Sequence, residues 1–169
     1  DYTSIHTVAT KVTSLGGTST SVLDAPGAEV MGTEAQILWL PNDNLSLGGN
    51  FSYTPNEYTK TLMILDPASV AIPTSLYPDR KTDRKNIKGN QLLQMPELKY
   101  TAFGRYSVPL DDCANLVLPT LYSWTDDVYY SPFENQTEMA EAYGRLDVRA
   151  TWTNAEKSLE VAAFCNNIF

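Results

Sequence analysis

Along most of the chain, apolar and polar residues alternate with a period of two. The clearest case runs from Leu45 to Tyr53, where leucine, glycine and aromatic residues alternate with serine, glycine and asparagine. In a second case, from Gly144 to Trp152, the polar positions carry charges. Successive side chains of a β-strand point to opposite faces, so the pattern predicts strands with one apolar and one polar face. The same alternation predicts further strands in residues 33–40, 99–108, 116–124 and 159–165.

The predicted strands are joined by connections of two lengths. Short turns, built from residues that favour tight turns, lie at residues 41–44, 109–112 and 154–157. Longer connections span residues 14–27, 59–90 and 128–139. Short and long connections alternate, as they must in a meander whose hairpin turns all lie at one end. Outer-membrane barrels have this asymmetry, so we expect an all-β fold, an antiparallel up-and-down transmembrane β-barrel meander with about seven strands of a larger barrel.

Aromatic residues on the apolar faces test the barrel hypothesis. Trp39, Tyr106 and Trp152 each lie a few residues before a short turn, and we expect them to form a ring at one level. Tyr53 and Trp124 lie far from the turns, and we expect them to form a second ring. Two such aromatic girdles bound the apolar band of an outer-membrane barrel. A soluble β-sandwich is the alternative, but its core gives no reason to place aromatic residues at two heights.

The polar faces of the predicted strands carry charges of both signs. In a barrel these side chains face the lumen, and the candidate lumen-facing residues are Glu34, Lys99, Arg105, Arg145, Asp147 and Arg149. Such charges are unfavourable against lipid and common in a wet or protein-filled interior. Two interpretations stay open. One is a solvated wall with cross-strand ion pairs, and the other is contact from residues such as Arg145 and Arg149 to a plug domain or a ligand.

Composition narrows the classes of function. The chain has 169 residues, of which 43% are hydrophobic and 19% are charged, and its net charge is -8. This acidic balance argues against a nucleic-acid partner. No stretch approaches the ~20 consecutive apolar residues of a membrane-spanning helix. Residues 1–10 lack the basic-then-apolar pattern of a signal peptide.

The sequence has few residues of the types that bind metals or act in catalysis. The one histidine, His6, and the two cysteines, Cys113 and Cys165, form no metal-ligand or disulfide pattern, so we expect no metal and no cofactor. The sequence has no nucleophile motif and no phosphate-binding loop. The paired aspartates at 111–112 and 126–127 lie at predicted strand ends, where acidic residues are common. We therefore expect that the chain is not an enzyme.

The long connections hold the candidate ligand-binding residues. Basic residues crowd the second half of the connection 59–90, although the chain is acidic: Arg80, Lys81, Arg84, Lys85 and Lys88. The connection 128–139 adds the aromatic candidates Tyr129, Tyr130 and Phe133. We expect these extracellular loops to meet lipopolysaccharide phosphates or an anionic ligand through charge-assisted contacts. The alternative is a solvated loop whose charges only keep it soluble.

Several segments resemble the barrel of TonB-dependent outer-membrane receptors. The likeness is carried by residues 28–34 (AEVMGTE), by Trp39-Leu40-Pro41 and by the strand 44–53. It continues in residues 89–92 with Pro96, in 99–102, in 142–147 and in 164–169. In that family a Gly-x-Glu strand precedes a Trp-x-Pro turn and a Leu-Ser strand that ends in an aromatic residue. The resemblance covers nearly the whole chain.

The resemblance implies the outer membrane of a Gram-negative bacterium and energy-coupled uptake of a scarce nutrient, an iron-siderophore, cobalamin or an oligosaccharide. The implied partners are outer-membrane lipid, the small-molecule or oligosaccharide ligand, and the TonB energy-coupling protein through regions absent here. Such receptors resemble a barrel of ~22 strands around a plug. We therefore expect residues 1–169 to be part of one β-barrel domain, a fragment without plug domain or signal peptide. The alternatives are a complete eight-stranded barrel, acting as anchor or adhesin, and a secreted glycan-binding β-sandwich.

Overall fold

The computed structural model describes residues 5–12, 18–25, 27–66, 84–110 and 114–169. The chain divides into two units. The first, which we call the loop unit, comprises residues 1–31, 55–95 and 128–140. The second, the sheet unit, comprises residues 32–54, 96–127 and 141–169. The predicted alternating strands supply the sheet unit, and the predicted long connections supply most of the loop unit.

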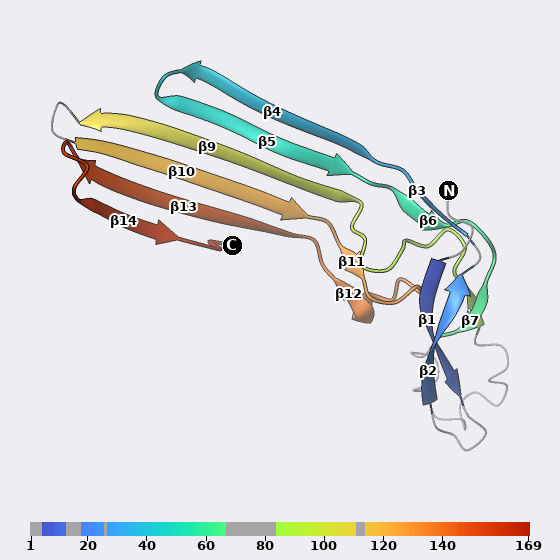
Figure 1. Cartoon of the computed structure of the whole chain (residues 1–169). Helices are drawn as coiled ribbons and strands as arrows, with labels where there is room; N and C mark the ends of the chain where they lie inside the picture. Colours follow the sequence, from blue (N-terminus) through green and yellow to red (C-terminus); the bar gives the residue numbers. More distant parts are fainter. Residues whose placement is uncertain (1–4, 13–17, 26, 67–83, 111–113) are drawn as a thin grey trace. The chain divides into compact units, whose positions relative to one another are not determined.

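The sheet unit is a six-stranded antiparallel sheet (Figure 1). Its strands are β4 (Thr33–Asn42), β5 (Leu45–Tyr53), β9 (Leu98–Leu110), β10 (Ala114–Thr125), β13 (Tyr143–Asn154) and β14 (Glu160–Cys165). Each strand pairs with the next strand of the sheet along the chain, in the order β4-β5-β9-β10-β13-β14. The predicted all-β antiparallel meander is confirmed. Its three hairpin connections lie at one end of the sheet, and residues 111–113 of the second lie outside the described residues.

Asparagine side chains shape the first and third hairpin turns. Asn42 Oδ1 accepts hydrogen bonds from the backbone N–H groups of Asn44 and Leu45, both at 2.9 Å. In the third turn, Asn154 Oδ1 accepts a hydrogen bond from the Leu159 N–H at 2.9 Å. An asparagine that bonds to the backbone a few residues ahead stabilises a turn locally. These local bonds stabilise both turns, and a backbone hydrogen bond from the Ser107 N–H to the Asn44 carbonyl, at 2.8 Å, joins the first turn to β9.

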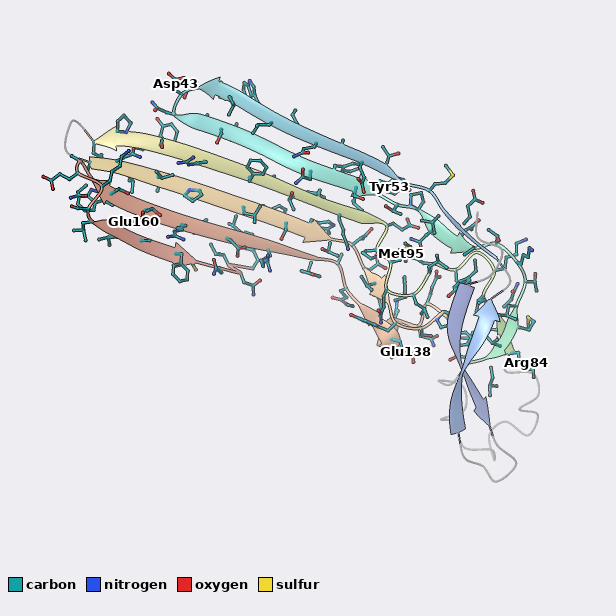
Figure 2. The ribbon with its side chains drawn as sticks, in the orientation of Figure 1. Asp43, Tyr53, Arg84, Met95, Glu138 and Glu160 are labelled. Atoms are coloured by element: carbon teal, nitrogen blue, oxygen red, sulfur yellow. The ribbon has the colours of Figure 1, made fainter. Side chains whose placement is uncertain are left out.

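The sheet unit has no core of its own. None of its described side chains is buried, and large apolar residues such as Trp39 and Phe164 are 60% and 70% exposed. Side chains stand off both faces of the ribbon (Figure 2). The strands are held together by backbone hydrogen bonds along the ladders. A β-sandwich would bury the apolar face against a second sheet, so the structure argues against that alternative.

The described strands do not close into a barrel. β4 and β14 form the two edges of the sheet, and the order of strands does not join them. In hydrocarbon each unsatisfied backbone group costs several kcal/mol, so a lipid-spanning sheet must pair its edges. An open sheet is therefore expected for part of a larger barrel wall.

The described part of the loop unit contains short two-stranded antiparallel sheets (Figure 1). Its paired strands are β1 (Ile5–Val12) with β2 (Thr18–Ala25), β3 (Ala28–Val30) with β6 (Asn56–Tyr58), β7 (Met63–Leu65) with β8 (Arg84–Asn86), and β11 (Val128–Tyr129) with β12 (Met139–Ala140). A single 3-10 turn, η3 (Gln136–Glu138), is the one helical element of the described residues. None of the helical structure in the described ranges is long and apolar enough to cross a membrane.

One prediction about this region is wrong. We expected residues 14–27 to form a connection, but β2 occupies most of that range. Its β-branched threonine and valine residues favour the extended conformation, and it pairs with β1 from Ile5 opposite Ala25 to Val12 opposite Thr18. The eight-stranded alternative requires this segment in the barrel wall. The structure instead places β2 in a separate two-stranded sheet.

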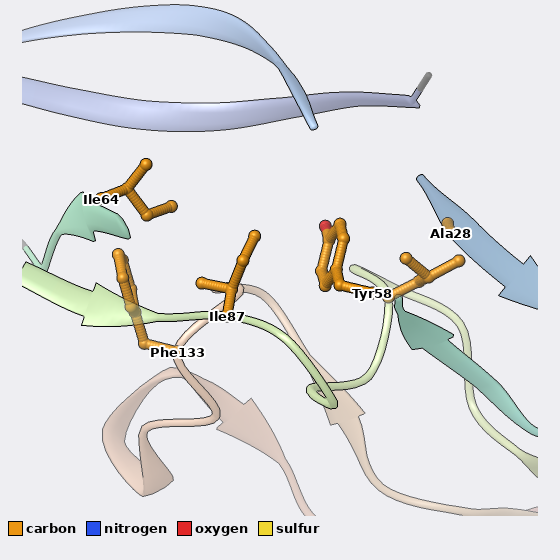
Figure 3. Packing of buried hydrophobic residues seen from close by; sticks show 6 residues of the cluster. Ala28, Tyr58, Ile64, Ile87 and Phe133 are labelled. Carbon is orange, nitrogen blue, oxygen red and sulfur yellow. The ribbon is translucent and has the colours of Figure 1, made fainter. Parts of the chain in front are cut away.

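A buried apolar cluster holds the loop unit together (Figure 3). Its members are Ala28, Tyr58, Ile64, Ile87, Leu92 and Phe133. Backbone hydrogen bonds connect the segments that carry them, for example from the Tyr58 N–H to the Asn90 carbonyl at 2.9 Å. The buried Asn56 side chain also accepts a hydrogen bond from the Leu92 N–H at 2.8 Å. The long connections therefore fold on a small core of their own.

Candidate functional site

The register of the sheet sorts its residues into two faces, because residues opposite each other in antiparallel strands point to the same side. The apolar face contains the even-numbered residues of β9, β10 and β13, the odd-numbered residues of β5 and β14, and Ala35, Ile37 and Trp39 of β4. It carries no charged residue in the described strands. The polar face contains the residues between them. All six candidate lumen-facing residues lie on it: Glu34, Lys99, Arg105, Arg145, Asp147 and Arg149.

Aromatic residues near the hairpin turns are offset from strand to strand by a constant step. The cross-strand row that contains Trp39 continues through Leu47, Gly104, Thr120 and Val148. Tyr106 of β9 lies two residues closer to the turns than this row, and Trp152 of β13 lies four residues closer. Because β9 is two strands from β4 and β13 is four strands from it, the offset is one residue per strand.

The aromatic residues far from the turns repeat this step. Tyr53 of β5 is opposite Leu98, whereas Trp124 of β10 is opposite Tyr100. Trp124 is therefore two residues closer to the turns than Tyr53, across two strands. The rings of Tyr100 and Trp124 stack, with centroids 6.2 Å apart and an interplanar angle of 19°. The two aromatic levels therefore follow parallel lines with the same diagonal slope across the sheet.

This diagonal has the slope of a tilted barrel wall. One residue of rise, about 3.3 Å, over a strand spacing of about 4.8 Å corresponds to a tilt of about 35°. Strands of outer-membrane barrels are tilted by roughly 35–45°. When the aromatic level near the hairpin turns is extended to β10, it falls at the height of Val117, seven residues before Trp124. At that tilt the two levels are about 19 Å apart in height, comparable with an apolar band of about 25 Å.

The charged residues of the polar face pair with one another within the wall. Arg145 Nε lies 3.4 Å from Asp147 Oδ2, and Arg149 Nη2 lies 3.7 Å from Glu160 Oε1. Arg149 Nε also donates to Thr151 Oγ1 at 3.1 Å. Both arginine side chains remain half-exposed, and exposed pairs of this kind contribute only about 0–1 kcal/mol. Their effect is to orient guanidinium groups on the polar face.

A hollow of about 520 Å³, which we call the strand-end hollow, lies at the end of the sheet away from the hairpin turns, and polar side chains of this face contribute to a lining that is mainly apolar. Glu34 and Lys99 flank Ser52 in one cross-strand row of its lining. In the next row, Asn50 Nδ2 donates to Thr101 Oγ1 at 3.3 Å. The hollow therefore offers a carboxylate, an ammonium group, amides and hydroxyls, which bind polar ligands through hydrogen bonds. The described residues contain no cluster of three metal-ligating side chains.

The candidate basic residues of the loop unit differ in their surroundings. Arg80 and Lys81 lie outside the described residues. Arg84 and Lys88 are exposed. Lys85, in contrast, forms an ion pair within the loop unit, with its Nζ 2.6 Å from Asp66 Oδ2. Within the described ranges, Arg84 and Lys88 are therefore the two of these residues that form no ion pair.

The three aromatic candidates of this unit also differ in their exposure to solvent. Tyr130 is 59% exposed, and Tyr129 is half-buried in β11. Phe133 is 8% exposed and belongs to the buried cluster. An aromatic residue that packs in a core offers a ligand almost no surface. The placement of Phe133 therefore gives its proposed role as a ligand contact no support.

Comparison with protein families decides the class of this molecule. Residues 1–168 match the family model described as TonB dependent receptor-like, beta-barrel. The chain belongs to this family. No curated protein and no solved structure matched it. Membership in the TonB-dependent receptor family implies a receptor or transporter of the Gram-negative outer membrane, and the family is not one of enzymes.

One feature of this receptor wall was not predicted from the sequence. Phe103, Leu121 and Phe164 interrupt the polar face and line a second hollow, of about 590 Å³. The Phe103 ring lies over Gly48 on the neighbouring strand, where an added Cβ would meet it. A glycine opposite an aromatic residue is a known device for pinning strand register. That pairing was the available signal, but it is visible only when the register of β5 and β9 is known.

Proposed function

We propose that the sheet unit is part of the lipid-facing wall of an energy-coupled receptor that takes up a scarce nutrient. The observation that carries the proposal is the charge-free apolar face, with aromatic residues at two levels offset by one residue per strand. This offset makes each level horizontal once the strands are tilted. Trp39, Tyr106 and Trp152 then form one membrane girdle, and Tyr53 and Trp124 form the other.

The polar face lines the lumen in this arrangement. Its residues Glu34, Lys99 and Arg105 carry charges that the ion pairs of β13 and β14 do not use. The strand-end hollow, whose lining includes hydrogen-bond donors and acceptors, is suited to a ligand with polar groups that passes along the wall. An iron-siderophore, cobalamin or an oligosaccharide each meets that description. Arg84, Lys88 and Tyr130 of the loop unit are the exposed candidates for a first contact with the ligand.

The partners follow from the proposed wall. Outer-membrane lipid covers the apolar face. Energy for uptake comes from the TonB coupling protein, which acts through regions outside residues 1–169. The lumen-facing residues bind and orient the ligand, and none of them needs to perform covalent chemistry. The chain therefore contributes to selectivity and passage, whereas transport belongs to the intact receptor.

The ligand is identified best with the intact receptor. We expect receptor purified from the outer membrane of its host to retain a small hydrophilic molecule that mass spectrometry identifies. Deletion of the receptor gene should abolish uptake of that molecule at low external concentration, and so should loss of the energy-coupling protein. Uptake that continues unchanged in both strains would contradict the proposal.

A matched pair of substitutions tests the strand-end hollow. The double change Asn50→Ala and Lys99→Ala removes an amide and an ammonium group from its lining. Thr153→Ala, on the same face near the hairpin turns, is the control. We expect the double variant to weaken binding of the identified ligand by about tenfold, equivalent to roughly 1.4 kcal/mol. Equal binding by both variants, with equal amounts of receptor in the membrane, would exclude the hollow as a binding surface.

A further inference from the structure

Three polar side chains from distant parts of the loop unit meet at one point. Asp66 follows β7, Lys85 lies in β8, and Asn135 precedes η3. Lys85 Nζ lies 2.6 Å from Asp66 Oδ2 and donates to Asn135 Oδ1 at 3.2 Å. Asn135 Nδ2 donates to both carboxylate oxygens of Asp66, at 3.2 and 3.3 Å. Each of the three side chains therefore contacts the other two.

The carboxylate of this triad is removed from water. The Asp66 side chain is 2% exposed, whereas that of Lys85 is 52% exposed. Ile64, Ile87 and Phe133 each lie two residues from a triad member, and all three belong to the buried cluster (Figure 3). A lone buried carboxylate is unfavourable, and the contacts of Asp66 with Lys85 and Asn135 offset that cost.

A second carboxylate completes the arrangement. Glu138 Oε2 accepts a hydrogen bond from Asn135 Nδ2 at 3.2 Å. The amide nitrogen of Asn135 therefore faces two carboxylates, while its carbonyl oxygen faces an amine. A primary amine held against an amide carbonyl, with acids placed to move protons, is the arrangement that nucleophilic acyl transfer requires.

We propose that Lys85 and Asn135 join in a self-catalysed isopeptide bond. Asp66 accepts one proton from the Lys85 ammonium group, and the resulting amine attacks Asn135 Cγ. A second Nζ proton passes through the carboxylates to Nδ2, and the Cγ–Nδ2 bond breaks. Ammonia leaves and takes the remaining proton from Asp66, so that the products are an Nζ–Cγ amide and one ammonium ion. The step consumes no oxidant, metal or cofactor.

The bond would tie together two of the long connections in the loop unit. Lys85 and Asn135 are separated by 50 positions in the sequence, one in the connection 59–90 and the other in 128–139. Exposed loops open locally and are preferred sites of proteolysis. A covalent bond between them limits that opening. It also removes the charge of Lys85, which then contributes nothing to binding of an anionic ligand.

Peptide mapping of the intact receptor from the outer membrane tests the proposal directly. Trypsin should fail to cleave after Lys85 and should release a branched peptide, in which residues 85–88 are attached to residues 106–145. Its mass should be about 17 Da below the sum of the two peptides, which is the mass of one ammonia. Normal cleavage after Lys85, with both peptides at their unmodified masses, would overturn the proposal.

Two substitutions and one control test the roles of Lys85 and Asp66 in forming the bond. Lys85→Arg keeps the positive charge but removes the amine, and Asp66→Asn removes the proton acceptor. We expect no branched peptide from either variant. Lys88→Arg, a change at an exposed lysine three positions away, should retain it fully. A branched peptide at the original yield in Asp66→Asn would overturn the catalytic part assigned to Asp66. If a variant does not reach the membrane, the peptide map of the unmodified receptor still decides the question.

Discussion

The two units of the molecule are stabilised in different ways. Every buried apolar residue of the described chain lies in the loop unit, for example Tyr58 at 2% exposure and Ile87 at 0%. The sheet unit has none, although its strands carry many large apolar side chains. Its order comes from continuous backbone ladders between neighbouring strands.

The difference indicates the solvent for which each unit is built. A segment in water must gather its apolar residues into a core, as the loop unit does. A strand against lipid gains nothing by hiding them, and needs only to pair its backbone groups. An apolar face without a core is thus a defect in a soluble protein and an expected property of a membrane wall.

The largest expected effect concerns the edges of the sheet. In the described sheet the outer edges of β4 and β14 have no neighbouring strand, and each unsatisfied backbone group in hydrocarbon costs several kcal/mol. We expect the isolated chain, refolded into liposomes, to show no heat-modifiable band on gels and no solute leakage. A discrete, protease-resistant monomer with reproducible conductance would instead favour a small complete barrel.

The core of the loop unit should respond strongly to truncation. Ile87→Ala removes a fully buried side chain and should destabilise this unit by about 2–5 kcal/mol. Met63→Ala, at a residue 47% exposed on β7, is the matched control and should cost far less. Limited proteolysis of the intact receptor measures the difference, as faster cleavage within residues 55–95. Equal cleavage rates in the two variants would show that the buried cluster does not hold the unit together.

The two faces of β13 should respond differently to a charge. Val148→Arg places a guanidinium group on the apolar face and should destabilise the folded wall by about 2–4 kcal/mol. Thr151→Arg places it on the polar face, beside Arg149, and should cost less. Folding titrations of the intact receptor in lipid compare the two variants. Equal costs would mean that the face assignment is wrong.

The smallest expected effect concerns the basic loop residues. Replacement of Arg80, Lys81, Arg84 and Lys88 by alanine leaves the Lys85–Asp66 pair intact and removes four positive charges. We expect a few-fold loss of affinity for an anionic ligand, and a smaller loss as salt screens the charges. Lys157→Ala, in a hairpin turn, is the control. Unchanged affinity at low ionic strength would leave these residues as solubilising charges only.

The strands and faces of the sheet unit were predictable because their signal is local. Alternation from Leu45 to Tyr53 and from Gly144 to Trp152 matches β5 and β13, and it separates the charged residues from the apolar ones. Two short turns also carried their own asparagine signals. The offset between Trp39 and Trp152 was not predictable, because it depends on the register of four strand pairs.

The loop unit was predicted poorly because its contacts join distant positions. The sequence alone does not distinguish a ligand contact from a core residue at Phe133. The structure does, because it places Phe133 in one buried cluster with Ile64 and Ile87. Lys85 likewise belongs to a basic cluster in the sequence, yet in the structure it pairs with Asp66. Local patterns carry no information on such partners. The candidate site on the sheet was therefore better anticipated than the one in the loops.

The lipid-facing wall is tested most directly by spin labels along β13. Single cysteine variants of the intact receptor at each residue from 145 to 152 would be labelled and studied in lipid bilayers by electron paramagnetic resonance. Oxygen, which concentrates in lipid, should accelerate the spin relaxation of labels at Leu146, Val148, Ala150 and Trp152. A water-soluble nickel complex should instead accelerate the spin relaxation of labels at the alternate residues. Accessibility without a period of two, or with the opposite phase, would contradict the proposed wall.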